Sequence, residues 1–118
     1  MDAQTAVELV GKYISIWNTA EKRSRQSLIE STFTPDAVYV DPNVTATGTT
    51  EIGKYIGDAS WNFVGMHFTH GTVLTHHDLV HFTWQVGPIG GPPAVSGYDV
   101  ALFEGGGITR LYGFFNGH

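Results

Sequence analysis

The sequence predicts a single α+β domain in which helices come first and an antiparallel sheet follows. In the first third of the chain, apolar residues recur every three or four positions, as in an amphipathic helix. From Met66 onward they alternate with polar residues, as in a strand. The 118 residues suit one domain over positions 1–118, large enough to bury a core without disulfides or metals. Helices followed by a strand meander predict helices packed on one face of a curved sheet.

Two longer helices are predicted before the first strand. The first carries an apolar stripe over residues 6–17, and Thr5 with Glu8 fits a capping box at its start. The second begins at Ser24 and ends at Thr34-Pro35-Asp36, because proline has no backbone N–H to donate and disfavours helix just before it.

Strands are predicted where β-branched and aromatic residues stand between turn residues. A short one covers residues 37–41 and ends at Pro42, and a short third helix follows from Gly48 to its predicted C-cap, Gly57. Four longer strands complete the sheet, over residues 66–76, 79–86, 94–103 and 108–115. The glycines at 105–107 join two strands, so they form a hairpin turn; a phosphate-binding loop would precede a helix.

Charged residues are scarce in the second half of the chain. From residue 59 to the end there are only four, namely Asp78, Asp99, Glu104 and Arg110. This half must therefore bury apolar surface in a core, a cavity or an interface. Strand alternation places Asp99 on the same face as Ala101 and Phe103, where burying a carboxylate is costly and shifts its pKa. Asp99 is therefore the first candidate for a functional residue.

The composition excludes several classes of protein. The chain has no cysteine, so it has no disulfide framework, zinc knuckle or catalytic thiol. Its net charge of −5 argues against binding to nucleic acid, and no apolar run is long enough to cross a membrane. Residues 1–4 lack the basic and apolar parts of a signal peptide, so we expect a cytoplasmic protein. We find no cofactor motif and expect no cofactor.

The order of these elements resembles the NTF2-like superfamily, in particular its SnoaL-like and ketosteroid-isomerase-like branch. The resemblance is carried by the strand 36–42 ending in Asp-Pro, by Gly48 opening the third helix, and by the strands 97–103 and 113–115. It implies a cystatin-like cone, in which three N-terminal helices pack on a strongly curved, mostly antiparallel sheet around a pocket. Many members dimerise through the outer sheet face, so the resemblance also implies a homodimer.

The resemblance assigns three candidate catalytic residues. In ketosteroid isomerase the general base is the Asp of an Asp-Pro pair after the first strand, where Asp41 stands here. The phenol that stabilises the oxyanion lies on the first helix, at Tyr13, and a second, protonated Asp lies in the penultimate strand, at Asp99. Together they imply proton transfer next to a carbonyl on an apolar, steroid- or polyketide-like substrate. The implied pocket residues are Trp17, Phe82, Trp84, Phe103, Leu111 and Phe115.

The match departs from the family at the residues that support the oxyanion tyrosine. Phe33 and Ile56 stand where the family has further tyrosines, and Tyr55 is one residue out of step. Each candidate also has an ordinary structural interpretation. An Asp-Pro pair at Asp41 commonly ends a strand, Tyr13 fits a core position, and a one-residue slip would turn Asp99 to the other face.

Two other functions stay open at this point. The first is a non-catalytic module that binds a small apolar ligand or forms a dimer, because a fold alone does not determine function. The second is a His–Asp dehydratase or polyketide cyclase, with a histidine from among His67, His70 and His76 reaching the pocket. The alternation of strand faces separates His67 from His70 and His76, which argues against a metal site.

Overall fold

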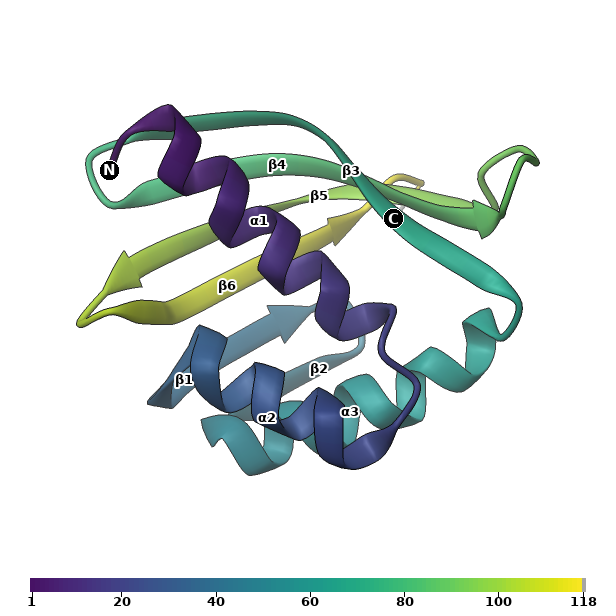
Figure 1. Cartoon of the computed structure of the whole chain (residues 1–118), viewed down its shortest axis with the longest axis horizontal. Helices are drawn as coiled ribbons and strands as arrows, with labels where there is room; N and C mark the ends of the chain where they lie inside the picture. The colour runs from purple at the N-terminus through teal and green to yellow at the C-terminus, as the bar shows by residue number, and fades with distance from the viewer. Residues whose placement is uncertain (118) are drawn as a thin grey trace.

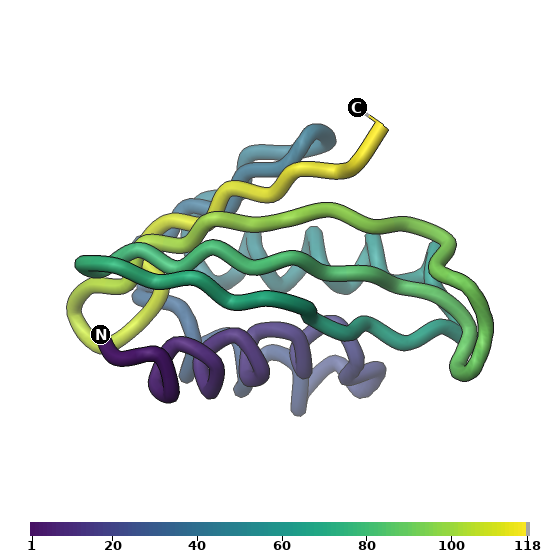
Figure 2. The backbone as a smooth tube through the Cα atoms, turned by 90° about the horizontal axis from the view of Figure 1, so that it is seen from above, coloured from purple at the N-terminus to yellow at the C-terminus, as the bar shows by residue number. Residues whose placement is uncertain are grey.

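The chain folds into a six-stranded sheet with its helices gathered on one side (Figures 1 and 2). This computed structural model describes residues 1–117. Its elements are α1 (Ala3–Trp17), α2 (Lys22–Thr32), β1 (Phe33–Asp41), β2 (Val44–Thr47), α3 (Gly48–Ser60), the 3₁₀ turn η1 (Trp61–Phe63), β3 (Met66–His76), β4 (Leu79–Pro88), β5 (Val95–Glu104) and β6 (Gly107–Phe115). The predicted α+β class is confirmed.

The sheet has the strand order β2-β1-β6-β5-β4-β3. Strand β1 runs parallel to β6, and every other neighbouring pair is antiparallel. Helix α1 crosses the face of the sheet that we call the inner face, and α2 and α3 pack beside β1 and β2 (Figure 1). The four long strands predicted from alternation all form, with ends that differ by no more than two residues.

The first helix starts earlier than the predicted capping box. Asp2 caps α1, and its Oδ1 accepts a hydrogen bond of 2.7 Å from the backbone N–H of Thr5. Glu8 lies within the helix and accepts from the side chain of Gln4. The capping-box prediction was therefore wrong, because the aspartate three residues earlier satisfies the N–H that Thr5 presents at the helix end.

Strand β1 begins at Phe33, four residues before the predicted start, and it contains Pro35. A proline is tolerated here because β2 pairs with β1 only from Val38 onward, so the earlier part of β1 lacks a neighbour on that side. The pairing with β6 also shifts register between Phe33 and Val38. The four-residue strand β2 was not predicted, since it is short and follows a tight turn.

Helix α3 continues past Gly57, which is not the predicted C-cap. A side chain at this position would meet the guanidinium of the buried Arg25, because an added Cβ would lie 2.7 Å from Arg25 Nη2. Arg25 in turn donates hydrogen bonds to the carbonyls of Thr19 and Ala20 in the α1–α2 connection. Gly57 thus makes room for an arginine that ties α2, α3 and this connection together.

The outer face of the sheet carries a short ladder of stacked rings. Tyr98 stacks on Phe114 with centroids 4.8 Å apart, and His81 stacks on Tyr98 at 5.2 Å. Phe114 and Tyr112 are both exposed. Homodimer formation through this face stays a prediction. Within residues 1–117, no helix has the length and apolar character needed to cross a membrane.

Candidate active site

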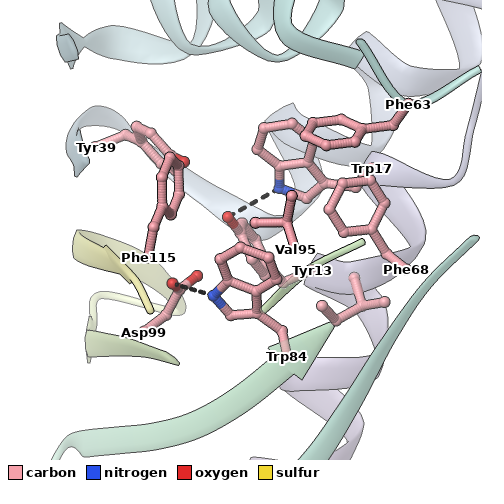
Figure 3. A pocket seen from close by; sticks show the side chains of 10 residues that line it. Tyr13, Trp17, Tyr39, Phe63, Phe68, Trp84, Val95, Asp99 and Phe115 are labelled. Atoms are coloured by element: carbon pink, nitrogen blue, oxygen red, sulfur yellow. Dashed lines mark hydrogen bonds between the residues drawn. The ribbon is translucent and has the colours of Figure 1, made fainter. Parts of the chain in front are cut away.

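A cavity of about 170 Å³ lies between α1 and the inner face of the sheet (Figure 3). Helix α1, the turn η1 and five strands contribute to its wall. The lining residues are Tyr13, Ile14, Trp17, Tyr39, Phe63, Phe68, Trp84, Val95, Asp99 and Phe115. Most of these side chains are aromatic, and only Asp99 carries an ionisable carboxyl. The wall is therefore apolar with a few polar groups at defined places, as is usual in small-molecule sites.

Tyr13 presents its hydroxyl to this cavity from the middle of α1. Trp17, one turn later on the same helix, donates its indole N–H to the Tyr13 oxygen at 2.9 Å (Figure 3). Burial raises the pKa of the Tyr13 hydroxyl well above its usual value, and the charge of Asp99 adds to this rise. Tyr13 is therefore a neutral phenol at physiological pH, able to donate one hydrogen bond.

Asp99 lies on β5 with its side chain on the inner face, as strand alternation predicts. It is only 4% exposed, and its Oδ1 accepts a hydrogen bond of 2.9 Å from the indole N–H of Trp84 on β4. Burial raises the pKa of Asp99 to about 7, and the charge of Asp41 contributes to the rise, while the hydrogen bond from Trp84 and the interaction with Tyr13 oppose it. This carboxyl can therefore gain or lose a proton near neutral pH.

Asp41 ends β1 and is held by three donors. Its Oδ2 accepts from the hydroxyls of Tyr39 at 2.8 Å and Tyr55 at 2.6 Å, and its Oδ1 accepts from the backbone N–H of Asn43 at 2.8 Å. Burial raises the pKa of both tyrosine hydroxyls, so they stay protonated and remain donors. Asp41 is 7% exposed and is not among the residues that line the cavity.

A glycine separates the two carboxyls. Gly113 on β6 is paired with Asp99 on β5, and an added Cβ there would lie 3.0 Å from Asp99 Oδ1 and 3.4 Å from Asp41 Cβ. Any larger residue would therefore press on both aspartates. Tyr39 also connects the two sides, because its hydroxyl donates to Asp41 and interacts with the hydroxyl of Tyr13.

The sequence matches a family model, described as a SnoaL-like domain, over residues 10–111. The chain belongs to the SnoaL-like family. Its structure is similar to a proposed isomerase of that family from Agrobacterium tumefaciens, with a TM-score of 0.90 and 26% identity, covering 97% of this chain and 99% of that one. A search of the curated proteins found no match.

Two further solved structures have the same fold. A proposed SnoaL-like polyketide cyclase from Jannaschia sp. CCS1 matches with a TM-score of 0.77 and 15% identity, over 96% of this chain and 86% of that one. A proposed ketosteroid isomerase from Kribbella flavida matches with a TM-score of 0.72 and 15% identity, over 98% and 80% respectively. At this identity the likeness concerns the fold alone, and it confirms the NTF2-like architecture.

The wall of this SnoaL-like cavity overlaps in part with the predicted pocket. Trp17, Trp84 and Phe115 line it, together with the predicted Tyr13 and Asp99. The other three predicted pocket residues lie elsewhere: Phe82 and Leu111 are fully buried in the core, and Phe103 packs partly buried against it. The ring of Tyr13 stands edge-on to Phe82, with centroids 5.8 Å apart, and so covers that part of the sheet.

Sequence reasoning missed half of the wall, namely Ile14, Tyr39, Phe63, Phe68 and Val95. Tyr39 could have been found, because it lies two residues before Asp41 and so shares its strand face. Phe63 and Phe68 follow the third helix, and only the tertiary fold brings them to α1. Other donors partly replace the tyrosines that the family has and this chain lacks. Trp17 donates a hydrogen bond to the Tyr13 hydroxyl, and Tyr55 donates one to Asp41.

The three histidines considered as candidates in this SnoaL-like protein do not line the cavity. His67, His70 and His76 are absent from its lining, and His70 Nδ1 lies 3.0 Å from the carbonyl oxygen of Gly71. His76 and His77 contact each other at the β3–β4 turn. Within the described part of the chain, no three histidine, aspartate or glutamate side chains gather as a metal site.

Proposed function

We propose that this SnoaL-like protein is an enzyme that transfers a proton next to the carbonyl group of an apolar compound, as an isomerase or an aldol-type cyclase. The observation that carries the proposal is the meeting of two groups in one aromatic cavity. Tyr13 offers a neutral phenol, and Asp99 offers a carboxyl with a pKa of about 7. An acid–base group with a pKa near the working pH is the most efficient kind for this chemistry.

In this proposal Tyr13 keeps its proton and donates a hydrogen bond from its hydroxyl to the carbonyl oxygen of the substrate. The developing enolate is then stabilised by a donor fixed in a site that excludes water, where a hydrogen bond is stronger than in bulk solvent. The indole N–H of Trp17 supports this role, because it donates to the Tyr13 oxygen and so favours the build-up of negative charge there.

Asp99 takes the proton from the carbon next to the carbonyl and returns it to the isomerised or cyclised product. The family resemblance assigns the base to Asp41 instead, with a neutral Asp99 as second oxyanion donor. We favour Asp99 because it lines the cavity, whereas both oxygens of Asp41 accept hydrogen bonds from protein groups. Asp41 is then a positioning residue that holds Tyr39, which interacts with Tyr13.

The experiment is exchange of α-protons for deuterium on a panel of apolar ketones, followed by NMR. We expect Asp99→Asn to lower the exchange rate by about 100-fold or more, since general bases contribute this much, and Asp41→Asn to retain a larger share of it. The rate should rise with pH through a midpoint near 7, because the ionised Asp99 is the active form. A rate that falls as pH rises through 7 would instead assign the base to Asp41, and full activity in both variants would contradict the proposal.

A non-catalytic binding module remains the second candidate, and the aromatic wall favours it as much as it favours an enzyme. The same experiment separates the two, because such a module would bind ketones without exchanging their protons. A His–Asp dehydratase has less support, since the hydrogen-bond partners of Asp41 and Asp99 are tyrosine, tryptophan and backbone groups.

A further inference from the structure

The size of the cavity limits what it can enclose. Its volume is about 170 Å³, whereas typical pockets for drug-sized ligands have roughly 300–1,000 Å³. An engineered apolar cavity of about 150 Å³ holds one benzene molecule. The space between α1 and the sheet therefore matches a single six-membered ring with one or two small substituents, and most of a fused four-ring skeleton would lie outside it.

The polar groups of the wall limit the chemistry of that ring. The N–H of Trp17 is used by Tyr13, the N–H of Trp84 by Asp99, and the hydroxyl of Tyr39 by Asp41. This leaves the carboxyl of Asp99 and the hydroxyl proton of Tyr13, which interacts with Tyr39 and Asp99 in the absence of a ligand. One ligand oxygen that accepts from Tyr13 would replace that interaction and leave Asp99 beside the ring carbons, so the cavity suits one oxygen and otherwise apolar atoms.

The charges around the cavity favour a neutral ligand. Asp99 lies in the wall and Asp41 lies on the other side of Gly113, while the lining includes no lysine or arginine. An anion would be repelled by the carboxylates and would find no cationic partner. Contacts between Trp17 and Phe68 and between Phe68 and Trp84, with centroids 5.2 Å and 6.3 Å apart, form a continuous aromatic surface against which a flat ring can pack.

We infer that the cavity binds a neutral compound with one unsaturated six-membered carbon ring that carries one oxygen substituent, such as a cyclic enone, and not a polycyclic steroid or polyketide. This inference deepens the proposed function and rests on it for the choice of site. It does not depend on whether the bound ring undergoes proton transfer.

The chain carries its own reporter for the test. Trp17 and Trp84 line the cavity, whereas the third tryptophan, Trp61, is 78% exposed. Trp61→Phe therefore removes the solvent-exposed emission and leaves two tryptophans that sense the cavity. Substitution at this exposed position should leave the fold unchanged, which a thermal melt checks.

The experiment titrates the Trp61→Phe protein with cyclohex-2-enone, with the two-ring ketone 1-tetralone and with the four-ring ketone testosterone. We expect cyclohex-2-enone to change the tryptophan emission saturably, and testosterone to bind about tenfold more weakly or worse, because overpacking is costly. Testosterone binding as tightly as cyclohex-2-enone or more tightly would overturn the inference, as would an absence of saturable binding by the single ring.

Two variants in the same background test whether the volume sets the preference. Val95→Phe narrows the cavity and should weaken cyclohex-2-enone binding, whereas Phe63→Ala widens it and should improve the binding of 1-tetralone relative to the single ring. If both variants fold and bind cyclohex-2-enone and 1-tetralone with the same affinities as the parent protein, the inference is contradicted. Saturable binding of cyclohex-2-enone without deuterium exchange would contradict the proposed enzyme and leave the ligand class standing, so the two failures can be told apart.

Discussion

Asp41 and Asp99 are buried carboxyls on either side of one glycine, yet their surroundings differ. Asp41 accepts three hydrogen bonds from Tyr39, Tyr55 and a backbone N–H, and it lies outside the cavity wall. Asp99 accepts one from Trp84, interacts with Tyr13 and lines the cavity. Burial alone therefore does not make a carboxyl reactive. What distinguishes Asp99 is that it has few donors and direct access to the ligand space.

The largest effect of the unusual surroundings of Asp99 is expected in the pH dependence of the free energy of unfolding. The pKa of Asp99 is about 7 in the folded protein against an ordinary value of 3.8, so the folded state holds a proton that the unfolded chain has released. As the pH rises from about 4 to about 7, the free energy of unfolding of the wild type should therefore fall relative to that of Asp99→Asn, by up to about 4 kcal/mol. Urea unfolding at several pH values measures this; parallel curves for the two proteins would contradict it.

At pH 8 the two isosteric substitutions should act in opposite directions. Asp41→Asn replaces an acceptor of three hydrogen bonds with a group that has fewer acceptor sites, and we expect a loss of about 2 kcal/mol. Asp99→Asn removes a buried charge and should stabilise the protein. Urea titrations of both variants provide the measurement, each serving as the control for the other. An equal loss of stability in Asp41→Asn and Asp99→Asn would contradict the predicted difference between the two carboxyls.

A smaller effect is expected at the glycine between them. Gly113→Ala places a Cβ 3.0 Å from Asp99 Oδ1, so this carboxyl must shift away from Trp84 or toward the cavity. We expect a loss of about 1 kcal/mol in stability and a weaker binding of cyclohex-2-enone. Gly11→Ala is a matched control, because nothing lies within 4 Å of a Cβ added there. Equal affinity of the two variants for cyclohex-2-enone would contradict the placement of Gly113 against the Asp99 carboxyl.

The sequence predicted the sheet better than the site. Alternation located the strands from Met66 onward and the inward direction of Asp99, because a half-buried strand repeats every two residues. It did not reveal that β1 contains Pro35, since this depends on where β2 stops pairing. The cavity wall was predicted only in part, because Phe68 reaches Trp17, and Phe63 reaches Phe68, through tertiary packing that no local pattern records.

Carboxyl carbon NMR can measure the pKa of Asp99 in the folded protein. A protein labelled with ¹³C in its aspartate side chains is titrated from pH 4 to pH 9, and the signal absent from Asp99→Asn is assigned to Asp99. We predict that this signal titrates with a midpoint of about 7, and that the midpoint falls in Asp41→Asn, because the charge of Asp41 contributes to the raised pKa. A midpoint near 4 in the wild type would contradict the account.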